Sequence, residues 1–294
     1  MFIILGNTYS LLFAQEQSES TQQPKRYAKQ TFRSTRFITV PTTKMHPKGG
    51  FEFGITHRFG YIDFDEPVFK DFFGLDLSSN IRFGFAFPIH KRVYVGVGRT
   101  KFDKNYDFEI NAVLLKQTRD NKQPVSISLY HNTAFMSNDF PEVGKNMFNA
   151  DTTEFSYKPI HRFAYYTQLS IARKFGSSFS AQVSPAIIYR NLTPSSDYEN
   201  LMLSVPVCAR LKVSIQGALI LETIPVVYNK PQNDYHMPLA LSFEVKTVSH
   251  VFQITVSNSN RILNQELYYN PVKNPFNEGF FLGFNLQKFF YFRK

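Results

Sequence analysis

Hydrophobic and polar residues alternate along most of the chain with a period of two, the pattern of a β-strand with one apolar and one mixed face. In the segment EGFFLGFNLQKFFYFRK the even positions from Phe280 to Leu286 are apolar, and Gly283, Asn285 and Gln287 stand among the odd ones. The alternation recurs from residue 51 onward in segments such as NIRFGFAF, RVYVGVG, YDFEINAVL and LALSFEVK. About twelve such segments of roughly 8–13 residues follow one another, the length that a tilted strand needs to cross a bilayer.

The connections between these segments alternate between long and short. Tight turns are expected at residues 89–91, 176–178 and 249–250, and long loops at residues 60–77, 136–160, 228–237 and 259–277, although the connection at 102–105 is short where a long one is expected. Long loops on one side and short turns on the other are typical of outer-membrane barrels. A soluble β-sandwich also alternates, but its charged face lies outside, whereas a membrane barrel turns its charged face to the lumen and its apolar face to lipid. We therefore predict an all-β fold, a closed antiparallel transmembrane β-barrel of about twelve strands over residues 36–294, with the sandwich as the alternative.

The N-terminus predicts export. A short apolar run ends at Ala14 before polar Gln15, which is typical of a secretory signal peptide over residues 1–14, although no Lys or Arg precedes the run; a short buried strand is the alternative. Residues 15–35 are polar and nearly free of aliphatic side chains, so we expect a flexible periplasmic lead-in. The predicted location is the outer membrane of a didermal bacterium.

The end of the chain favours the membrane barrel over the sandwich. Phe290 and Phe292 continue the even, lipid-facing series of the last strand, and such a terminal strand resembles the signal that the outer-membrane assembly machinery reads. Arg293 and Lys294 depart from that pattern, because such signals commonly end on the aromatic residue. The expected partners are outer-membrane lipid and the barrel assembly machinery, with any solute or periplasmic partner unidentified.

Composition narrows the function further. The 32 Phe and 16 Tyr favour strands, and the single Cys208 excludes internal disulfides and multi-cysteine metal sites. The net charge of +10 comes from scattered Lys and Arg without a nucleic-acid-binding motif, so no nucleic-acid partner is expected. The seven His show no metal-ligand spacing, and no cofactor is expected. Pro185, Pro206 and Pro225 fall inside predicted strands, where we expect bulges or strand ends.

Charged residues on the mixed face are candidates for lining the lumen, because a charge on a barrel strand must meet water or a partner. One interpretation is a polar, slightly basic channel that favours anionic solutes; the other is an internal salt-bridge network that plugs a narrow barrel. Gly96 and Gly98 lie on this face without a following helix that would hold phosphate, so we expect them to relieve crowding inside the barrel. The candidate lumen-lining residues are Arg58, Arg82, Glu109, Arg162, Arg190, Glu222 and Glu244.

Two further groups of residues suggest sites. His57 and Arg58 stand where the first strand meets its long loop, and with Asp76 they form either a rim site for a ligand or an Arg58–Asp76 pair that pins the loop, which we favour. The possibility of a lipid hydrolase at the rim is raised by His131, Asn132, Ser257 and Ser259, but no spacing matches a nucleophile elbow, so we expect no enzyme.

Four motifs carry a resemblance to a known family. HRFG at 57–60, FFGLD at 72–76, IRFGF at 81–85 and VGVGR at 95–99 occur in this order. Over residues 35–294 the chain resembles an outer-membrane β-barrel family of Bacteroidetes, a domain of unknown function. The resemblance implies a membrane barrel in a didermal bacterium and no particular activity. We therefore expect a monomeric, porin-like barrel for passive passage or binding of small solutes; the alternative is a closed structural or accessory barrel that presents loops 136–160 and 259–277 to a partner.

Overall fold

The structure, a computed structural model, describes residues 26–28, 31–67, 69–140, 142, 153–195, 198–231, 235–269 and 273–292. Its residues form one antiparallel sheet with two short 3-10 turns and a single-turn helix. The strands are β1 (Gly50–Asp63), β2 (Asn80–His90), β3 (Val93–Thr100), β4 (Asn105–Leu115), β5 (Ser126–Met136), β6 (Phe163–Phe175), β7 (Phe179–Val183), β8 (Ala186–Arg190), β9 (Leu201–Ser204), β10 (Val207–Lys212), β11 (Gly217–Thr223), β12 (Val226–Tyr228), β13 (Leu239–Lys246), β14 (His250–Ser257) and β15 (Gly279–Tyr291); the helix is α1 (Asn264–Leu267), and the 3-10 turns are η1 (Phe102–Lys104) and η2 (Pro159–Arg162).

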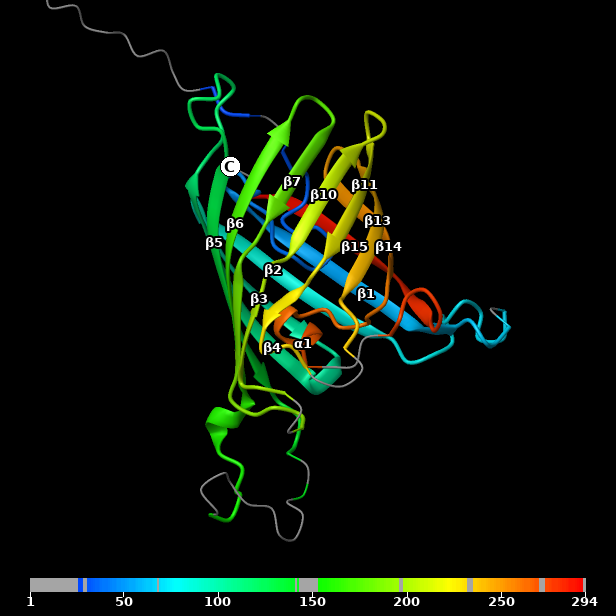
Figure 1. Cartoon of the computed structure of the whole chain (residues 1–294). Helices are drawn as coiled ribbons and strands as arrows, with labels where there is room; N and C mark the ends of the chain where they lie inside the picture. The colour runs from blue at the N-terminus through cyan, green and yellow to red at the C-terminus, as the bar shows by residue number, and fades with distance from the viewer. Residues whose placement is uncertain are drawn as a thin grey trace, which may run out of the picture.

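The sheet closes on itself as a barrel (Figure 1). The first and last strands pair along most of their length, from Gly50 opposite Tyr291 to Asp63 opposite Gly279. Three wall strands are each divided in two, β7 with β8, β9 with β10, and β11 with β12, so the barrel has twelve wall strands. This confirms the predicted closed antiparallel barrel.

Prolines divide these three wall strands at the same level. Pro185, Pro206 and Pro225 each lie two residues after the last residue of one strand and directly before the first residue of the next. The Ser184 N–H donates to the Pro206 carbonyl at 2.9 Å, and the Val205 N–H donates to the Pro225 carbonyl at 3.0 Å. Each proline lacks an N–H but keeps its carbonyl in the ladder, so the strands are interrupted without opening the wall, as the sequence predicted.

The two ends of the barrel differ in the length of their connections. Short turns at 91–92, 176–178, 213–216 and 247–249 lie at one end, and the connections 64–79, 137–162 and 258–278 lie at the other (Figure 1). The first and last described residues, near Tyr27 and Phe292, lie at the short-turn end, where Tyr27 forms a β-bridge with Thr118 and the Phe292 N–H donates to the Gly49 carbonyl. In outer-membrane barrels the short-turn end is periplasmic, and we use "periplasmic end" and "loop end" in this sense.

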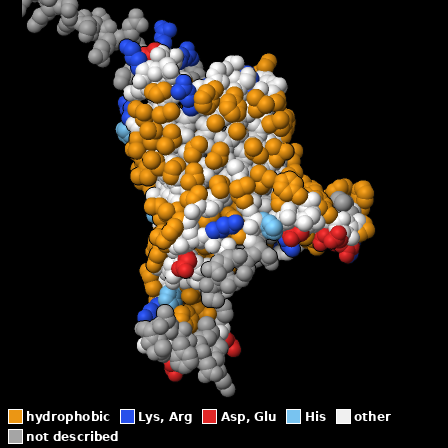
Figure 2. All heavy atoms as spheres, in the orientation of Figure 1, with side chains coloured by type: hydrophobic (Ala, Val, Ile, Leu, Met, Phe, Trp, Pro, Cys, Tyr) orange, Lys and Arg blue, Asp and Glu red, His pale blue; other side chains and the backbone are white. Residues whose placement is uncertain are grey.

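The outer wall is apolar. Phe83, Phe85 and Phe87 of β2 are exposed, while the intervening Gly84 and Ala86 are buried against the lumen. The same alternation on the other strands produces the apolar belt seen in Figure 2. Exposed apolar surface on this scale is far larger than soluble monomers carry, and it fits the lipid-facing band of a membrane barrel. Among the described residues, no helix is long and apolar enough to span a membrane.

The lumen is filled from both ends by the chain itself. Residues 32–42 enter from the periplasmic end and are buried, and residues 262–269, with α1, fold inward from the loop end. The buried segment begins at Phe32, four residues before the boundary expected at residue 36. Residues 1–25 and 29–30, which include the predicted signal peptide and most of the predicted lead-in, lie outside the described residues.

Candidate functional site

A short N-terminal hairpin occupies the middle of the lumen. We use this name for residues 35–42, in which Arg36 bridges to Pro41 and the Phe37 N–H donates to the Val40 carbonyl at 2.8 Å. Phe37, Ile38 and Val40 are buried in a cluster with wall residues that include Tyr130, Tyr166, Ile188 and Met202. A tight turn of this kind places three apolar side chains against the wall while its backbone polar groups remain to be satisfied.

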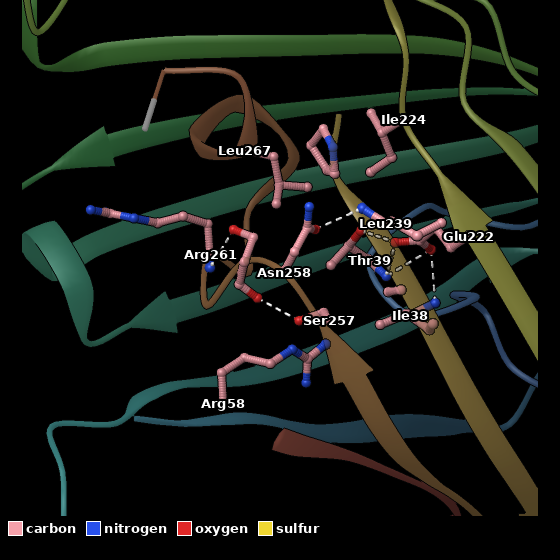
Figure 3. A pocket seen from close by; sticks show the side chains of 13 residues that line it. Ile38, Thr39, Arg58, Glu222, Ile224, Leu239, Ser257, Asn258, Arg261 and Leu267 are labelled. Atoms are coloured by element: carbon pink, nitrogen blue, oxygen red, sulfur yellow. Dashed lines mark hydrogen bonds between the residues drawn. The ribbon is translucent and has the colours of Figure 1, made fainter. Parts of the chain in front are cut away.

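Glu222 of β11 holds the tip of this hairpin. Its carboxylate accepts hydrogen bonds from the backbone N–H groups of Ile38 at 2.9 Å and Thr39 at 3.0 Å, and from the Thr39 hydroxyl (Figure 3). It also accepts one from the Val40 N–H at 2.9 Å. Glu222 is almost fully buried. A buried carboxylate is stable only when its oxygens are satisfied, so the hairpin and Glu222 stabilise each other.

Arg36 of the hairpin joins a buried charge cluster on the wall. Its guanidinium contacts the carboxylate of Glu109 and donates to the Tyr130 hydroxyl at 2.9 Å. Beside it, Arg82 binds Asp107 through two hydrogen bonds of 2.9 and 2.6 Å. Fork-like pairing satisfies the guanidinium and the carboxylate together. The hairpin therefore supplies one cation to a wall cluster that contains two carboxylates and one guanidinium.

Glycines make room for this cluster and explain two sequence motifs. A Cβ on Gly84, from the IRFGF motif, would lie 2.6 Å from Arg82 Nη1, and a Cβ on Gly98, from the VGVGR motif, would overlap the same guanidinium. A Cβ on Gly96 would lie 2.8 Å from Glu109 Cγ. The expectation that Gly96 and Gly98 relieve crowding inside the barrel is confirmed, and what these glycines and Gly84 accommodate is the buried charge cluster.

Wall amides complete the contacts with the hairpin. Gln168 and Gln182 both donate to the Pro41 carbonyl, at 3.0 and 2.7 Å. Asn285 donates to the Ile38 carbonyl at 2.9 Å, and Asn111 donates to the Thr42 carbonyl at 3.1 Å. The hairpin backbone is thus bound by side chains from β4, β6, β7, β11 and β15, in place of the strand partner that it lacks.

The inward-folded loop closes the other side. Gln265 donates to Asn132 at 2.6 Å, and Tyr268 shares a hydrogen bond of 2.7 Å with Ser204. Between loop and hairpin lies a cavity of about 20 Å³ lined by Ile38, Glu222, Arg58 and neighbouring residues (Figure 3). A space of this size holds about one water molecule. The closed-barrel alternative expected loop 259–277 to be presented to a partner. Residues 262–269 of this loop turn inward instead, so that part of it is not presented.

The structure places most predicted lumen-lining residues inside the barrel. Arg58, Arg82, Glu109, Glu222 and Glu244 are buried on the inner wall, where Glu244 accepts a hydrogen bond of 2.9 Å from Arg210. Arg190 lies nearer the loop end, with its guanidinium 5.6 Å from the centre of the Tyr269 ring.

The structure corrects the predicted position of Arg162. It belongs to η2, just before β6 begins at Phe163, and donates to the carbonyls of Met136 (2.9 Å) and Asn138. The alternating pattern assigned it to the strand, but a residue at a strand end binds the adjoining loop rather than lining the lumen. The middle of the lumen is not slightly basic, as the channel interpretation expected. The charged wall side chains that are at least nine-tenths buried there comprise five carboxylates and three guanidiniums. They are Glu52, Asp107, Glu109, Glu222 and Glu244, with Arg58, Arg82 and Arg210.

The predicted Arg58–Asp76 pair is absent from the described residues. The first strand continues to Asp63, so Arg58 lies inside the wall and donates to Asn285 at 3.0 Å, while Asp76 is exposed. His57 faces outward and stacks on Phe284 with 5.3 Å between ring centres.

Two glycines of the sequence motifs pin the first long loop instead. The Gly60 N–H donates to the Gly74 carbonyl at 2.9 Å. Gly74 has a φ of +77°, and a Cβ there would lie 2.6 Å from the Gly60 carbonyl oxygen. The HRFG and FFGLD motifs therefore meet through their glycines, because only a residue without a side chain permits this close approach.

The hydrolase alternative finds little support in the geometry. His131 faces outward in the middle of β5, and its ring nitrogens lie 2.8 Å from the Thr167 hydroxyl and 3.0 Å from the Thr133 hydroxyl. Ser257 faces the lumen and donates to the Ser259 carbonyl. Hydrolysis by such a histidine would need a neighbouring nucleophile and an orienting acid, and the partners found here are two threonines. Across the described part of the chain, no cluster of three His, Cys, Asp or Glu could hold a metal ion.

The hairpin is what sequence reasoning missed. Thr35 and Arg36 straddle the expected boundary of the lead-in, and the stretch RFITVPT was not assigned a role. The available signal was its composition: three apolar residues among polar neighbours, directly after a segment with almost none. The wall residues Gln168, Gln182, Asn111 and Asn285 carry no charge, so a search for inward charges could not find them.

Comparisons with known proteins give similar solved structures and a family. Among solved structures, the chain is similar to the NanC porin (9% identity, TM-score 0.49, covering 82% of this chain and 99% of that one) and to an outer membrane channel of Pseudomonas putida F1 (9%, 0.49, 84% and 98%). It is also similar to outer membrane phospholipase A of Escherichia coli (11%, 0.43, 84% and 92%). No curated protein matches the sequence. A family model described as membrane bound beta barrel domain (DUF5777) matches residues 32–290, and the chain therefore belongs to this family.

Proposed function

We propose that this outer-membrane barrel is a passage for small solutes that its own N-terminal hairpin closes, and that the passage opens when the hairpin withdraws toward the periplasm. The observation that supports this proposal is the polar wall behind the hairpin. Gln168, Gln182, Asn111 and Asn285 are buried while the hairpin is bound, yet all four are side chains that water satisfies. The same amides that bind the hairpin carbonyls can therefore bind water after the hairpin withdraws, whereas apolar side chains at these positions would make an open lumen unfavourable.

The proposal includes the cellular setting. The apolar belt fits a bilayer, and we propose export by a signal peptide at residues 1–14, assembly by the barrel machinery and a location in the outer membrane of a didermal bacterium such as a member of the Bacteroidetes. We further propose that the protein is not an enzyme, because His131 lacks the neighbours that hydrolysis requires.

The open passage should prefer cations. With the hairpin withdrawn, Arg36 leaves the wall, and the five buried carboxylates then outnumber the three buried guanidiniums. Lys174 and Lys246 lie toward the periplasmic mouth, where the solvent screens their charge more strongly than in the narrow middle. Rings of acidic side chains select cations in other pores.

Planar-bilayer recording tests the proposal with two variants. The first lacks residues 26–46, and the second also has residues 261–268 replaced by a Gly/Ser linker. The full chain should conduct rarely, whereas the first variant should give discrete steps with a reversal potential that indicates cation preference. If the first variant folds but is silent while the second conducts, the loop and not the hairpin is the gate. Silence of both folded variants would overturn the passage and favour a closed structural barrel.

A further inference from the structure

An extension of two strands leaves the barrel wall at the loop end. The pairing of β1 with β2 ends at Arg58 opposite Asn80, but its pairing with β15 continues to Asp63 opposite Gly279. We call residues 59–67, 69–79 and 273–282 the lateral arm. Figures 1 and 2 show it projecting sideways from the wall, level with the edge of the apolar belt.

The arm is locally ordered by its own backbone. Besides the Gly60–Gly74 bond, the Phe64 N–H donates to the Glu278 carbonyl at 3.0 Å, and Gly74 donates to Asp71 at 2.9 Å. Phe72 has a φ of +45° and Phe73 a φ of +58°, a conformation that bulky residues rarely adopt. A turn held in this way keeps its side chains in fixed positions, and rare backbone conformations are retained where a role compensates their cost.

The arm carries an exposed apolar surface. Phe69 is 77% exposed and Phe276 is 84% exposed, which is unusual for phenylalanine. Acidic residues accompany these rings, and Figure 2 shows the two kinds of side chain side by side on the arm. The exposed large apolar side chains are those of Phe64, Phe69, Phe72, Leu75, Leu77 and Phe276.

This surface continues the lipid-facing belt. The Phe64 ring lies 5.7 Å from that of Phe280, centre to centre, and Phe280 begins the outward series of β15. At the root of the arm, Lys273 lies 5.1 Å from the centre of the Tyr61 ring, an arrangement that suits the boundary between hydrocarbon and headgroups. The apolar side chains therefore adjoin a surface that lipid already covers.

We infer that the lateral arm inserts its aromatic side chains into the outer leaflet of the membrane, beside the barrel and at the level of the headgroups. The occupant of this surface is lipid: apolar rings enter the boundary of the acyl chains, and the acidic side chains stay among hydrated headgroups. The arm thereby fixes the depth and tilt of the barrel on the side of β1 and β15. This inference is independent of whether the lumen opens.

Tryptophan fluorescence tests the inference directly, because the chain contains no Trp. Single-tryptophan variants Phe69→Trp and Phe276→Trp are reconstituted into phosphatidylcholine vesicles whose acyl chains carry bromine at a shallow or a deep position. Ile110→Trp, in the outward series of β4, serves as the control for the belt, and Ile160→Trp, exposed in the other long loop, serves as the aqueous control.

The expected result is emission at shorter wavelength and stronger quenching by shallow than by deep bromine for both arm variants. Ile110→Trp should be quenched by deep bromine, and Ile160→Trp by neither. Emission from both arm variants like that of Ile160→Trp would overturn the inference. So would blue-shifted emission that bromolipid does not quench but that disappears on dilution of the protein in the vesicles, since that would identify a second copy as the occupant.

Discussion

Replacing Arg36 by Met should loosen the hairpin by an amount that the structure allows us to calculate. Arg36 contacts the Glu109 carboxylate and donates to the Tyr130 hydroxyl, and all three side chains are largely buried. A hydrogen bond to a charged group contributes about 1.5–3 kcal/mol, so we take a loss of about 2 kcal/mol. Since 1.4 kcal/mol is tenfold, the population of the withdrawn hairpin should rise about 30-fold.

Cys208 reports this population without further engineering. It is the single cysteine, 1% exposed, and faces the lumen opposite Glu222 on the neighbouring strand. Alkylation by a membrane-impermeant maleimide should therefore require withdrawal of the hairpin, and its rate should follow the withdrawn population when closing is faster than labelling. Arg36→Met should label about 30-fold faster than the parent protein.

Two further variants complete the measurement. Arg92→Met removes an exposed guanidinium that donates to the Leu114 carbonyl at 3.2 Å, away from the hairpin, and it should label at the parent rate. Glu109→Gln should resemble Arg36→Met, and the double variant should label little faster than either, because one interaction is lost only once. A parent rate for Arg36→Met in a folded barrel, or full additivity with Glu109→Gln, would refute the assigned role of the ion pair.

Two other predictions concern the wall and the inward loop. Gly98→Ala should destabilise the barrel by about 1–3 kcal/mol, because its Cβ would overlap the Arg82 guanidinium. Gly54→Ala, whose Cβ has its nearest neighbour at 3.9 Å, should cost little. Urea titration with heat-modifiable migration on gels measures both, and equal stability of the two variants would contradict the role of Gly98 in making room for Arg82. Burial raises the pKa of Glu266 on α1 to about 7, so the protonated side chain stabilises the loop in its inward position. This stabilisation is complete below the ordinary pKa of 4.5 and is lost as the pH rises through about 7. Tryptic cleavage after Arg261, measured relative to Glu266→Gln, should therefore accelerate as the pH rises from about 4.5 to 7 and change little above that; parallel pH profiles of the two proteins would refute the prediction.

The prediction that failed at the first loop shows how local and tertiary information differ. Arg58 and Asp76 were paired because opposite charges flank a loop in the sequence. Whether they meet depends on where β1 ends, and β1 runs five residues beyond Arg58 because β15 continues to pair with it. The loop is held by Gly60 and Gly74, and glycines in a motif indicate a close approach without naming its partner.

The alternation of apolar and polar residues by itself determined the barrel, its strand number, the inner and outer face of each strand and the interruptions at the prolines. This information is local, because a strand's two faces repeat every two residues whatever its neighbours are. The tertiary structure alone decided that the lumen is filled, by which segments, and that Glu222 and Arg36 hold the hairpin there. These contacts join residues more than seventy positions apart and replace water by protein, and one strand's pattern does not distinguish an inner face that meets water from one that meets its own chain.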